Sequence, residues 1–289
     1  MPERIDAHHH LWRYRKDEYD WIGPGMERIA RDFSTADLLD SAGPGGITGS
    51  VAVQACASMA ETDWLLAQAE ANSFIRGVVG WAPIAGAEFA SVLERLTAHK
   101  KLRGLRHVIQ AEPDDDFILR DDFNRGVKAL TPTGLIYDIL IYEKHLPATI
   151  KFVDRHPDQI FVLDHIAKPR IKDRLLEPWR ANIKHLAERN NVYCKFSGMV
   201  TEADWSAWNI ADLEPYAETV LESFGPQRLM FGSDWPVCLL ACGYGKWLAT
   251  AQHLASRLSA NEQEQIFGGV ATKVYSLQAS RDVAAHQQR

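Results

Sequence analysis

Short apolar runs that alternate with amphipathic segments along most of the chain limit the folds that this sequence can adopt. There are eight such runs, rich in β-branched residues, and we expect each to form a strand. They are Arg4–Ala7, Gly49–Gln54, Ile75–Trp81, Leu102–Ile109, Leu135–Ile141, Ile160–His165, Val192–Phe196 and Arg228–Gly232. Strands that alternate with helices predict βαβ units and a parallel sheet. Eight such units predict an α/β fold of the closed (β/α)8 type, a TIM barrel, and no glycine-rich dinucleotide fingerprint follows the first run to favour an open sheet.

Most of the segments between these runs carry apolar residues at helical spacing. The predicted helices are Glu61–Ala71, Glu88–His99, Asp121–Leu130, Leu146–His156, Trp179–Asn190, Leu213–Phe224 and Lys246–Leu258. The 289 residues suit one barrel domain, because such barrels commonly run to about 250 residues plus insertions. Residues 12–32 form a long first connection, which is either a lid or wall of a site or a packed loop. Residues 279–289 are polar, and we expect a frayed tail there.

The composition favours a protein that acts on a small molecule. A net charge of -6 does not supply the basic surface that a nucleic-acid binder uses. No apolar run reaches the roughly 18 residues of a membrane-spanning helix, and the first residues lack the apolar core of a signal peptide. The four cysteines form no CxxC pair, which is typical of reduced thiols, so we expect a cytoplasmic protein. Whether it forms a homo-oligomer stays open.

Histidines gather at the end of the first predicted strand, where barrels of this type place their active sites. In an extended chain alternate side chains share a face, so His8 and His10 should point together and His9 away from them. Two imidazoles spaced in this way can hold one divalent metal. The other interpretation is that the pair satisfies local backbone groups.

Two further strand ends carry groups that can move protons or bind metal. The sixth predicted strand ends in Asp164 and His165, of which we expect His165 to face the site and Asp164 to point the other way. Asp234 follows the eighth strand, where a carboxylate can bind a metal and shuttle protons. Either His165 or Asp234 could instead cap a local turn.

Several other strand ends and loops offer candidate contacts for a substrate. Arg106 and Lys195 are cations that we expect near the rim, where they could polarise a carbonyl. Polar or aromatic side chains that could line a pocket or stack on a ring are Gln54, Trp81, His107, Tyr137 or Tyr142, Trp12, Trp21 and Trp235. Core packing is the alternative for the aromatic side chains.

Four segments together resemble the amidohydrolase superfamily, in particular its amidohydrolase-2 branch of TIM-barrel lactonases. They are Asp6-Ala7-His8-His9-His10, Leu163-Asp164-His165-Ile166-Ala167-Lys168-Pro169, Cys194-Lys195-Phe196-Ser197-Gly198 and Phe231-Gly232-Ser233-Asp234-Trp235-Pro236. The likeness spans roughly residues 4–277. Within the branch the chain is most similar to L-fucono-lactonases and other sugar-acid lactonases, on the segments Trp12-Arg13-Tyr14-Arg15, Trp21-Ile22-Gly23, Val200-Thr201-Glu202-Ala203-Asp204-Trp205 and Phe224-Gly225-Pro226-Gln227-Arg228-Leu229-Met230-Phe231.

The resemblance implies a carboxylic ester hydrolase that opens a small-molecule lactone, with Asp234 as the residue that activates water. We expect Asp234 then to protonate the leaving ring oxygen, while His165, Lys195 or Arg106 stabilises the oxyanion. Superfamily members with two metals usually have a strand-four Lys or Glu and a strand-five His, which this chain lacks. We therefore expect at most one divalent metal, zinc by preference, held by His8, His10, His165 and Asp234, and catalysis without a metal stays open.

Other functions fit part of the pattern. A lactonase for an aromatic-pathway substrate, such as a muconolactone or a pyrone dicarboxylate, would need more converging arginines than Arg106, with Arg13 and Arg15 as further candidates. A decarboxylase of the same superfamily would depend strictly on metal. A barrel that binds a ligand without catalysis is the alternative outside enzymes, and the presence of His8, His10, His165 and Asp234 together argues against it.

Overall fold

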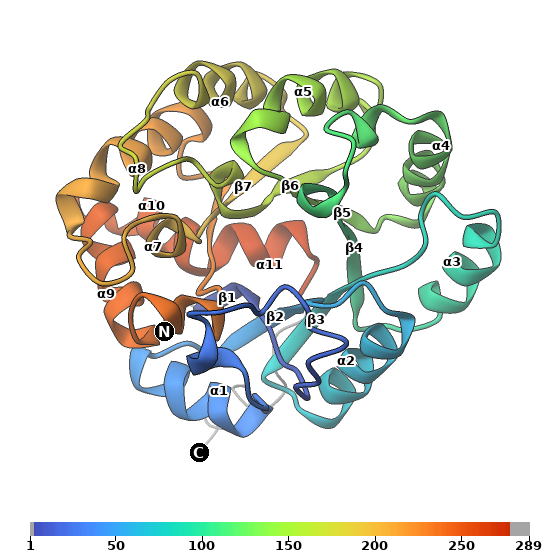
Figure 1. Ribbon diagram of the computed structural model, residues 1–289, viewed down its shortest axis with the longest axis horizontal. Coiled ribbons are helices and arrows are strands. Elements are labelled where there is room, and N and C mark those ends of the chain that lie inside the picture. The colour runs from blue at the N-terminus through green and yellow to red at the C-terminus, as the bar shows by residue number, and fades with distance from the viewer. Residues whose placement is uncertain (1–2, 278–289) are drawn as a thin grey trace.

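The computed structural model describes residues 3–277, and they form one sheet of eight parallel strands in the order β1 to β8 (Figure 1). The strands are β1 (Ile5–His9), β2 (Gly49–Val53), β3 (Ile75–Gly80), β4 (Leu102–Val108), β5 (Ile136–Leu140), β6 (Phe161–Leu163), β7 (Val192–Phe196) and β8 (Leu229–Phe231). The predicted (β/α)8 barrel is therefore confirmed, with one strand at each of the eight predicted runs. The predicted frayed tail at 279–289 lies outside the described residues.

Helices surround the strands, and all seven predicted helices are present (Figure 1). They are α2 (Met59–Ala71), α3 (Phe89–Thr97), α4 (Asp121–Leu130), α5 (Leu146–Asp154), α6 (Trp179–Ala187), α8 (Ile210–Phe224) and α9 (Tyr244–Leu254). The helices that we did not predict are α1 (Thr35–Ala42), α7 (Met199–Glu202), α10 (Ala260–Glu264) and α11 (Val270–Val274). The start of α1 has a capping box between Ser34 and Asp37, a signal that was readable in the sequence.

Two apolar cores hold the barrel together. The larger core lies between the strands and the outer helices. The smaller core fills the barrel interior with residues such as Ile5, Val51 and Met230. Helix α11 lies across the barrel axis in Figure 1, and Ala271 and Tyr275 from this region join the interior core. The interior is thus packed from below, and only the opposite end, where the strands have their carboxyl ends, is left for a site.

The barrel closes at a seam between β1 and β8. An isolated bridge joins His9 of β1 to Trp235, which follows β8, and no full ladder pairs the two strands. Hydrogen bonds continue the seam beyond the strands, because the Asp234 N–H donates to the His8 carbonyl at 2.8 Å and the His10 N–H donates to the Trp235 carbonyl at 2.6 Å. The seam therefore sets Asp234 beside the two histidines through backbone contacts.

The long connection after β1 is folded against the barrel. Trp12 and Phe33 exchange two backbone hydrogen bonds, of 3.1 and 2.9 Å, that close the base of the loop. The rings of Trp12, Tyr19 and Phe33 pack together and are almost fully buried. These contacts describe a packed loop, while its role as a lid or site wall stays a prediction.

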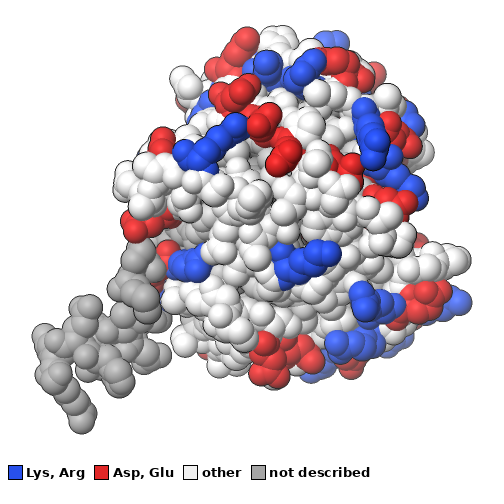
Figure 2. All heavy atoms as spheres, turned by 90° about the vertical axis from the view of Figure 1, so that its left-hand side faces the viewer, with Lys and Arg blue, Asp and Glu red and all other residues white. Residues whose placement is uncertain are grey.

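Charged side chains of both signs are interspersed on the face drawn in Figure 2, and no large patch of one sign stands out there. Within residues 3–277, no helix is long and apolar enough to cross a membrane.

Two helical glycines offer a test of how tightly the outer helices pack. A Cβ at Gly126 in α4 would come within 2.0 Å of the Ile84 carbonyl oxygen, whereas a Cβ at Gly245 in α9 would meet nothing within 4 Å. We expect Gly126→Ala to destabilise the protein by about 1–3 kcal/mol, because the backbone of Ile84 must move. Gly245→Ala is the matched control and should be neutral or stabilise by up to about 1 kcal/mol. Urea unfolding measures both, and equal stabilities of the two variants would contradict the packing described.

Candidate active site and metal centre

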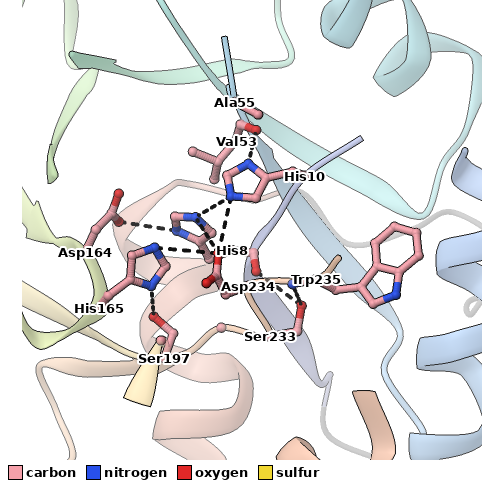
Figure 3. A network of polar contacts seen from close by, with 12 residues as sticks. His8, His10, Val53, Ala55, Asp164, His165, Ser197, Ser233, Asp234 and Trp235 are labelled. Carbon is pink, nitrogen blue, oxygen red and sulfur yellow. Dashed lines mark hydrogen bonds and ion pairs between the residues drawn. The ribbon is translucent and has the colours of Figure 1, made fainter. Parts of the chain in front are cut away.

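His8 and His10 meet at the carboxyl end of β1. The register of β1 against β2 shifts between Asp6 and His9, which marks a bulge or similar irregularity. The Nε2 atoms of His8 and His10 lie 3.2 Å apart, as the predicted shared face requires, and both rings are buried (Figure 3). His10 is fixed by a 2.8 Å hydrogen bond between its Nδ1 and the Val53 carbonyl. The two imidazoles thus present their Nε2 atoms to the same point.

His165 and Asp234 reach this point from left-handed backbone turns. His165 has a φ of 51°, and the three residues that follow it also have positive φ. Asp234, which follows β8 after Gly232 and Ser233, has a φ of 54°. Non-glycine residues rarely adopt this conformation, and such backbone strain gathers at functional sites.

Asp234 is the carboxylate around which the histidines are arranged (Figure 3). Its Oδ1 atom lies 3.3 Å from His10 Nε2, 3.8 Å from His8 Nε2 and 3.7 Å from His165 Nε2. His165 in turn is held by a 2.9 Å hydrogen bond between its Nδ1 and Ser197 Oγ. One oxygen of Asp234 therefore faces three imidazole nitrogens.

The spacing of three of these atoms fits a metal. His8, His10 and Asp234 form one group of potential ligand atoms, while His8, Asp164 and His165 form a second. The separations of 3.2, 3.3 and 3.8 Å within the first group are close to the edge of roughly 3.3 Å expected for a tetrahedral zinc site with bonds of about 2.0–2.1 Å. The predicted four ligands do not form a single group, because His165 belongs to the second one.

The electrostatics favour an ionised Asp234 and neutral His8 and His165 rings. Burial acts to raise the pKa of Asp234, but His165, His10 and Lys168 nearby outweigh it and lower that pKa below its usual value. Burial lowers the pKa of His165 to about 4. Burial and the adjacent Lys195 ammonium hold the pKa of His8 well below its usual value. A neutral imidazole beside an ionised carboxylate is the state in which both can bind a metal or move a proton.

Two expectations about the barrel mouth are wrong. Asp164 does not point away from the site, because the strand ends at Leu163 and the left-handed turn that follows breaks the alternation. Lys195 and Arg106 do not lie at the rim, since their side chains are 0% and 3% exposed and both form ion pairs with Asp164 inside the barrel.

The remaining polar candidates lie near the ends of β2, β3 and β4. The Trp81 indole N–H donates to His107 Nδ1 at 3.3 Å, and His107 Nε2 lies 2.6 Å from a carboxylate oxygen of Glu112. These two side chains are partly exposed. The buried side-chain amide of Gln54 has no hydrogen-bond partner among the described residues.

Three aromatic candidates are packed in the core. Tyr137 is fully buried among Phe123, Phe152 and Phe161, between the strands and the outer helices. Trp12 packs against Tyr19 and Phe33, and Trp235 packs against Phe33 and points away from the histidines (Figure 3). Their position favours the core-packing interpretation for all three.

Two other aromatic candidates, Trp21 and Tyr142, are exposed, and so is Trp205, which the sequence did not single out for this role. Trp21, Tyr142 and Trp205 are 38%, 39% and 37% exposed, and they lie on the connections that follow β1, β5 and β7. Trp205 lies in a segment that carries the family likeness, and that likeness was the signal that could have singled it out.

Glu61, a buried carboxyl that sequence reasoning missed, forms hydrogen bonds that connect the loop at 12–32 to the segment after β2. Glu61 accepts hydrogen bonds from the Ala55 and Cys56 N–H groups at 2.9 and 2.8 Å, and from the Tyr19 hydroxyl at 2.9 Å. Trp21 adds a 3.0 Å bond from its indole N–H to the Ala55 carbonyl. Glu61 lies on a helix that the sequence marked only as amphipathic, so nothing in the pattern singled it out.

Glu61 predicts a pH-dependent stability. Burial raises its pKa from 4.5 to about 7, so the folded protein holds a proton there that the unfolded chain releases between these values. Below pH 4.5 the protonated Glu61 contributes its full stabilisation to the folded state, up to about 3 kcal/mol. This contribution is lost as the pH rises to about 7. Relative to wild type, Glu61→Gln should therefore gain stability as the pH is raised. Urea unfolding at several pH values measures this gain, and the exposed-site variant Glu94→Gln is the control; a pH-independent difference for Glu61→Gln would refute the expectation.

Comparisons with known proteins agree with the geometry. A family model described as amidohydrolase matches residues 5–277. An L-fucono-1,5-lactonase of Burkholderia multivorans is 42% identical over 96% of this chain and 98% of its own length. An L-fucono-1,5-lactonase of Burkholderia ambifaria is 35% identical over 96% of this chain and 97% of its own. A crystal structure of an amidohydrolase from Burkholderia multivorans with bound zinc superposes with a TM-score of 0.92 at 42% identity, covering 96% of this chain and 100% of that one.

Proposed function

Because the chain belongs to the amidohydrolase family, we propose that it hydrolyses a sugar-acid lactone of the L-fucono-1,5-lactone type to the aldonic acid. The observation that carries the proposal is the Asp234 carboxylate, buried at the barrel mouth and faced by three imidazole nitrogens. Two relatives named for this activity match the chain over nearly its full length. The substrate class is therefore the same small, neutral, hydroxylated lactone.

Asp234 can act as both base and acid in this reaction. Its carboxylate takes a proton from water, whose oxygen bonds to the lactone carbonyl carbon. The tetrahedral oxyanion then collapses, the bond from that carbon to the ring oxygen breaks, and Asp234 returns the proton to the ring oxygen. Asp234 ends the cycle as it began, so a single carboxyl serves both steps.

His165 is the side chain best placed to stabilise the oxyanion. If Ser197 Oγ donates to its Nδ1, the neutral ring carries its proton on Nε2, next to Asp234. An N–H aimed at a developing oxyanion in a buried site contributes about 3 kcal/mol. This role passes to His165 because Lys195 and Arg106 are occupied inside the barrel.

A divalent metal, zinc by preference, held by His8, His10 and Asp234 would supply Lewis-acid polarisation of the lactone carbonyl. The fit of the three ligand atoms and the zinc in the related crystal structure support this proposal. We leave His165 out of the ligand set, so that it stays free for the substrate.

The mouth suits a neutral sugar ring better than a dicarboxylate. Trp21, Tyr142 and Trp205 offer exposed aromatic faces on which the apolar face of a sugar can stack. Arg106 is paired with Asp164, so the one strand-end arginine that could hold a substrate carboxylate is not free. This contact argues against a muconolactone or pyrone dicarboxylate as the substrate.

The cellular setting stays a proposal. All four cysteines are free thiols, which is usual in a reducing compartment and supports a cytoplasmic location.

The test is acid release from a panel of aldonolactones, followed by pH indicator. We expect the wild-type protein to accelerate hydrolysis of L-fucono- and L-galactono-type lactones, and Asp234→Asn to lose about 10²–10⁴-fold in kcat/KM while keeping its fold. Asp158→Asn, an exposed aspartate before β6, is the matched control and should keep full activity. Near-full activity of Asp234→Asn would refute the mechanism, and no turnover by the wild type across the panel would refute the function.

A further inference from the structure

A network of four charged side chains lies inside the barrel, directly beneath His8. Lys195 Nζ lies 2.6 Å from Asp138 Oδ2 and 2.9 Å from Asp164 Oδ1, and Arg106 Nη1 lies 2.8 Å from Asp164 Oδ2. All four residues are at most 3% exposed. The Tyr275 hydroxyl contacts both oxygens of Asp138, at 2.9 and 2.8 Å, and completes the network from below. Two cations and two carboxylates balance, so the barrel interior carries no net charge from this set.

His8 joins this network to the mouth through its two ring nitrogens. Its Nδ1 lies 3.0 Å from Lys195 Nζ and 3.3 Å from Asp164 Oδ1. Its Nε2 lies 3.2 Å from His10 Nε2. Arg106 Nη1 is 3.5 Å from His8 Nε2, at the limit of hydrogen bonding, and has Asp164 as its nearer partner. A neutral imidazole carries one proton, and its two neighbourhoods decide which nitrogen holds it.

The contacts without a metal favour the proton on Nε2. The Lys195 ammonium can only donate, so it needs a lone pair on His8 Nδ1. His10 Nδ1 faces a carbonyl, which can only accept, so a neutral His10 has its lone pair on Nε2 and accepts from His8. A chain of donors then runs from Lys195 through His8 and His10 to the Val53 carbonyl. Asp164 Oδ1 is ion-paired with Lys195 Nζ and also lies 3.3 Å from His8 Nδ1.

A metal on His8 Nε2 requires the opposite arrangement. The lone pair must then be on Nε2 and the proton on Nδ1, where it can donate to Asp164 Oδ1, 3.3 Å away. The ring stays neutral, since one proton leaves Nε2 and one is placed on Nδ1. In that state the Lys195 ammonium faces an N–H group at Nδ1 instead of a lone pair. Lys195 therefore opposes the tautomer that a metal needs, and Asp164 supports it.

We propose that Lys195 and Asp164 are opposed positioning residues that set the tautomer of His8, so that Lys195 weakens metal binding at the mouth and Asp164 strengthens it. The predicted effect on metal affinity rests on the proposed metal site. The predicted tautomer of His8 in protein without metal is independent of that site.

The first experiment reads the tautomer directly. Nitrogen-15 NMR of the histidine side chains distinguishes the two neutral forms in chelator-treated protein. We expect the Nε2–H form of His8 in wild type and the Nδ1–H form in Lys195→Met/Asp138→Asn, which removes one charge of each sign and leaves Tyr275 a partner. Asp164→Asn should keep the Nε2–H form. Lys101→Met, whose Nζ donates to the Ile75 carbonyl at the far end of the barrel, is the control. The Nδ1–H form in wild type, or no change in the double variant, would overturn the proposal.

The second experiment measures zinc affinity by competition with a chromophoric chelator. We expect about 10-fold tighter binding in Lys195→Met/Asp138→Asn and about 10–100-fold weaker binding in Asp164→Asn, the range typical of groups that orient a metal ligand. Weaker binding in the double variant would overturn the proposal. If neither the wild type nor any variant binds zinc, the proposed metal site fails, and the NMR result alone decides the assignment of Lys195 and Asp164.

Discussion

The β1–β8 seam is the constraint on which the site depends. The carbonyl of His8 and the N–H of His10 each form a hydrogen bond with the segment Asp234–Trp235, so the contacts that close the barrel also bring the carboxylate to the histidines. Asp6 strengthens the seam by accepting from the N–H groups of both His8 and Ser233. A change that loosens the seam would alter catalysis and stability together, because the same backbone atoms serve both.

Beneath the seam, charge replaces part of the apolar packing that usually fills such a barrel. Burying Lys195, Arg106, Asp138 and Asp164 is costly, and only complete pairing makes it tolerable. Buried ion pairs are weak contributors to net stability, so their value here lies in orientation. The four side chains lie beneath His8 and contact its Nδ1 through Lys195 and Asp164. His10 contacts the other ring nitrogen, Nε2, from the mouth.

The sequence pattern predicted the barrel because the spacing of apolar residues within each element, and the order of the elements, can be read directly along the chain. It also predicted the meeting of His8 and His10, since two alternate residues of one strand share a face. Asp164 was misplaced because alternation fails where the chain turns left-handed at His165, which no local pattern announced. Lys195 and Arg106 were expected at the rim because a strand pattern gives the face of a residue and not its depth in the barrel. Glu61 was missed because its partners, Tyr19 and the N–H groups of Ala55 and Cys56, come together only in the folded chain.

The central claim is that Asp234 delivers water to the carbonyl carbon of a lactone bound at this mouth. A crystal structure of Asp234→Asn with L-fucono-1,5-lactone tests it most directly. The account predicts the ring above the histidines, with a water held by the substituted amide side chain about 3–3.5 Å from the carbonyl carbon and His165 Nε2 beside the carbonyl oxygen. A lactone bound with its carbonyl turned away from that side chain, or bound outside the barrel mouth, would contradict the account.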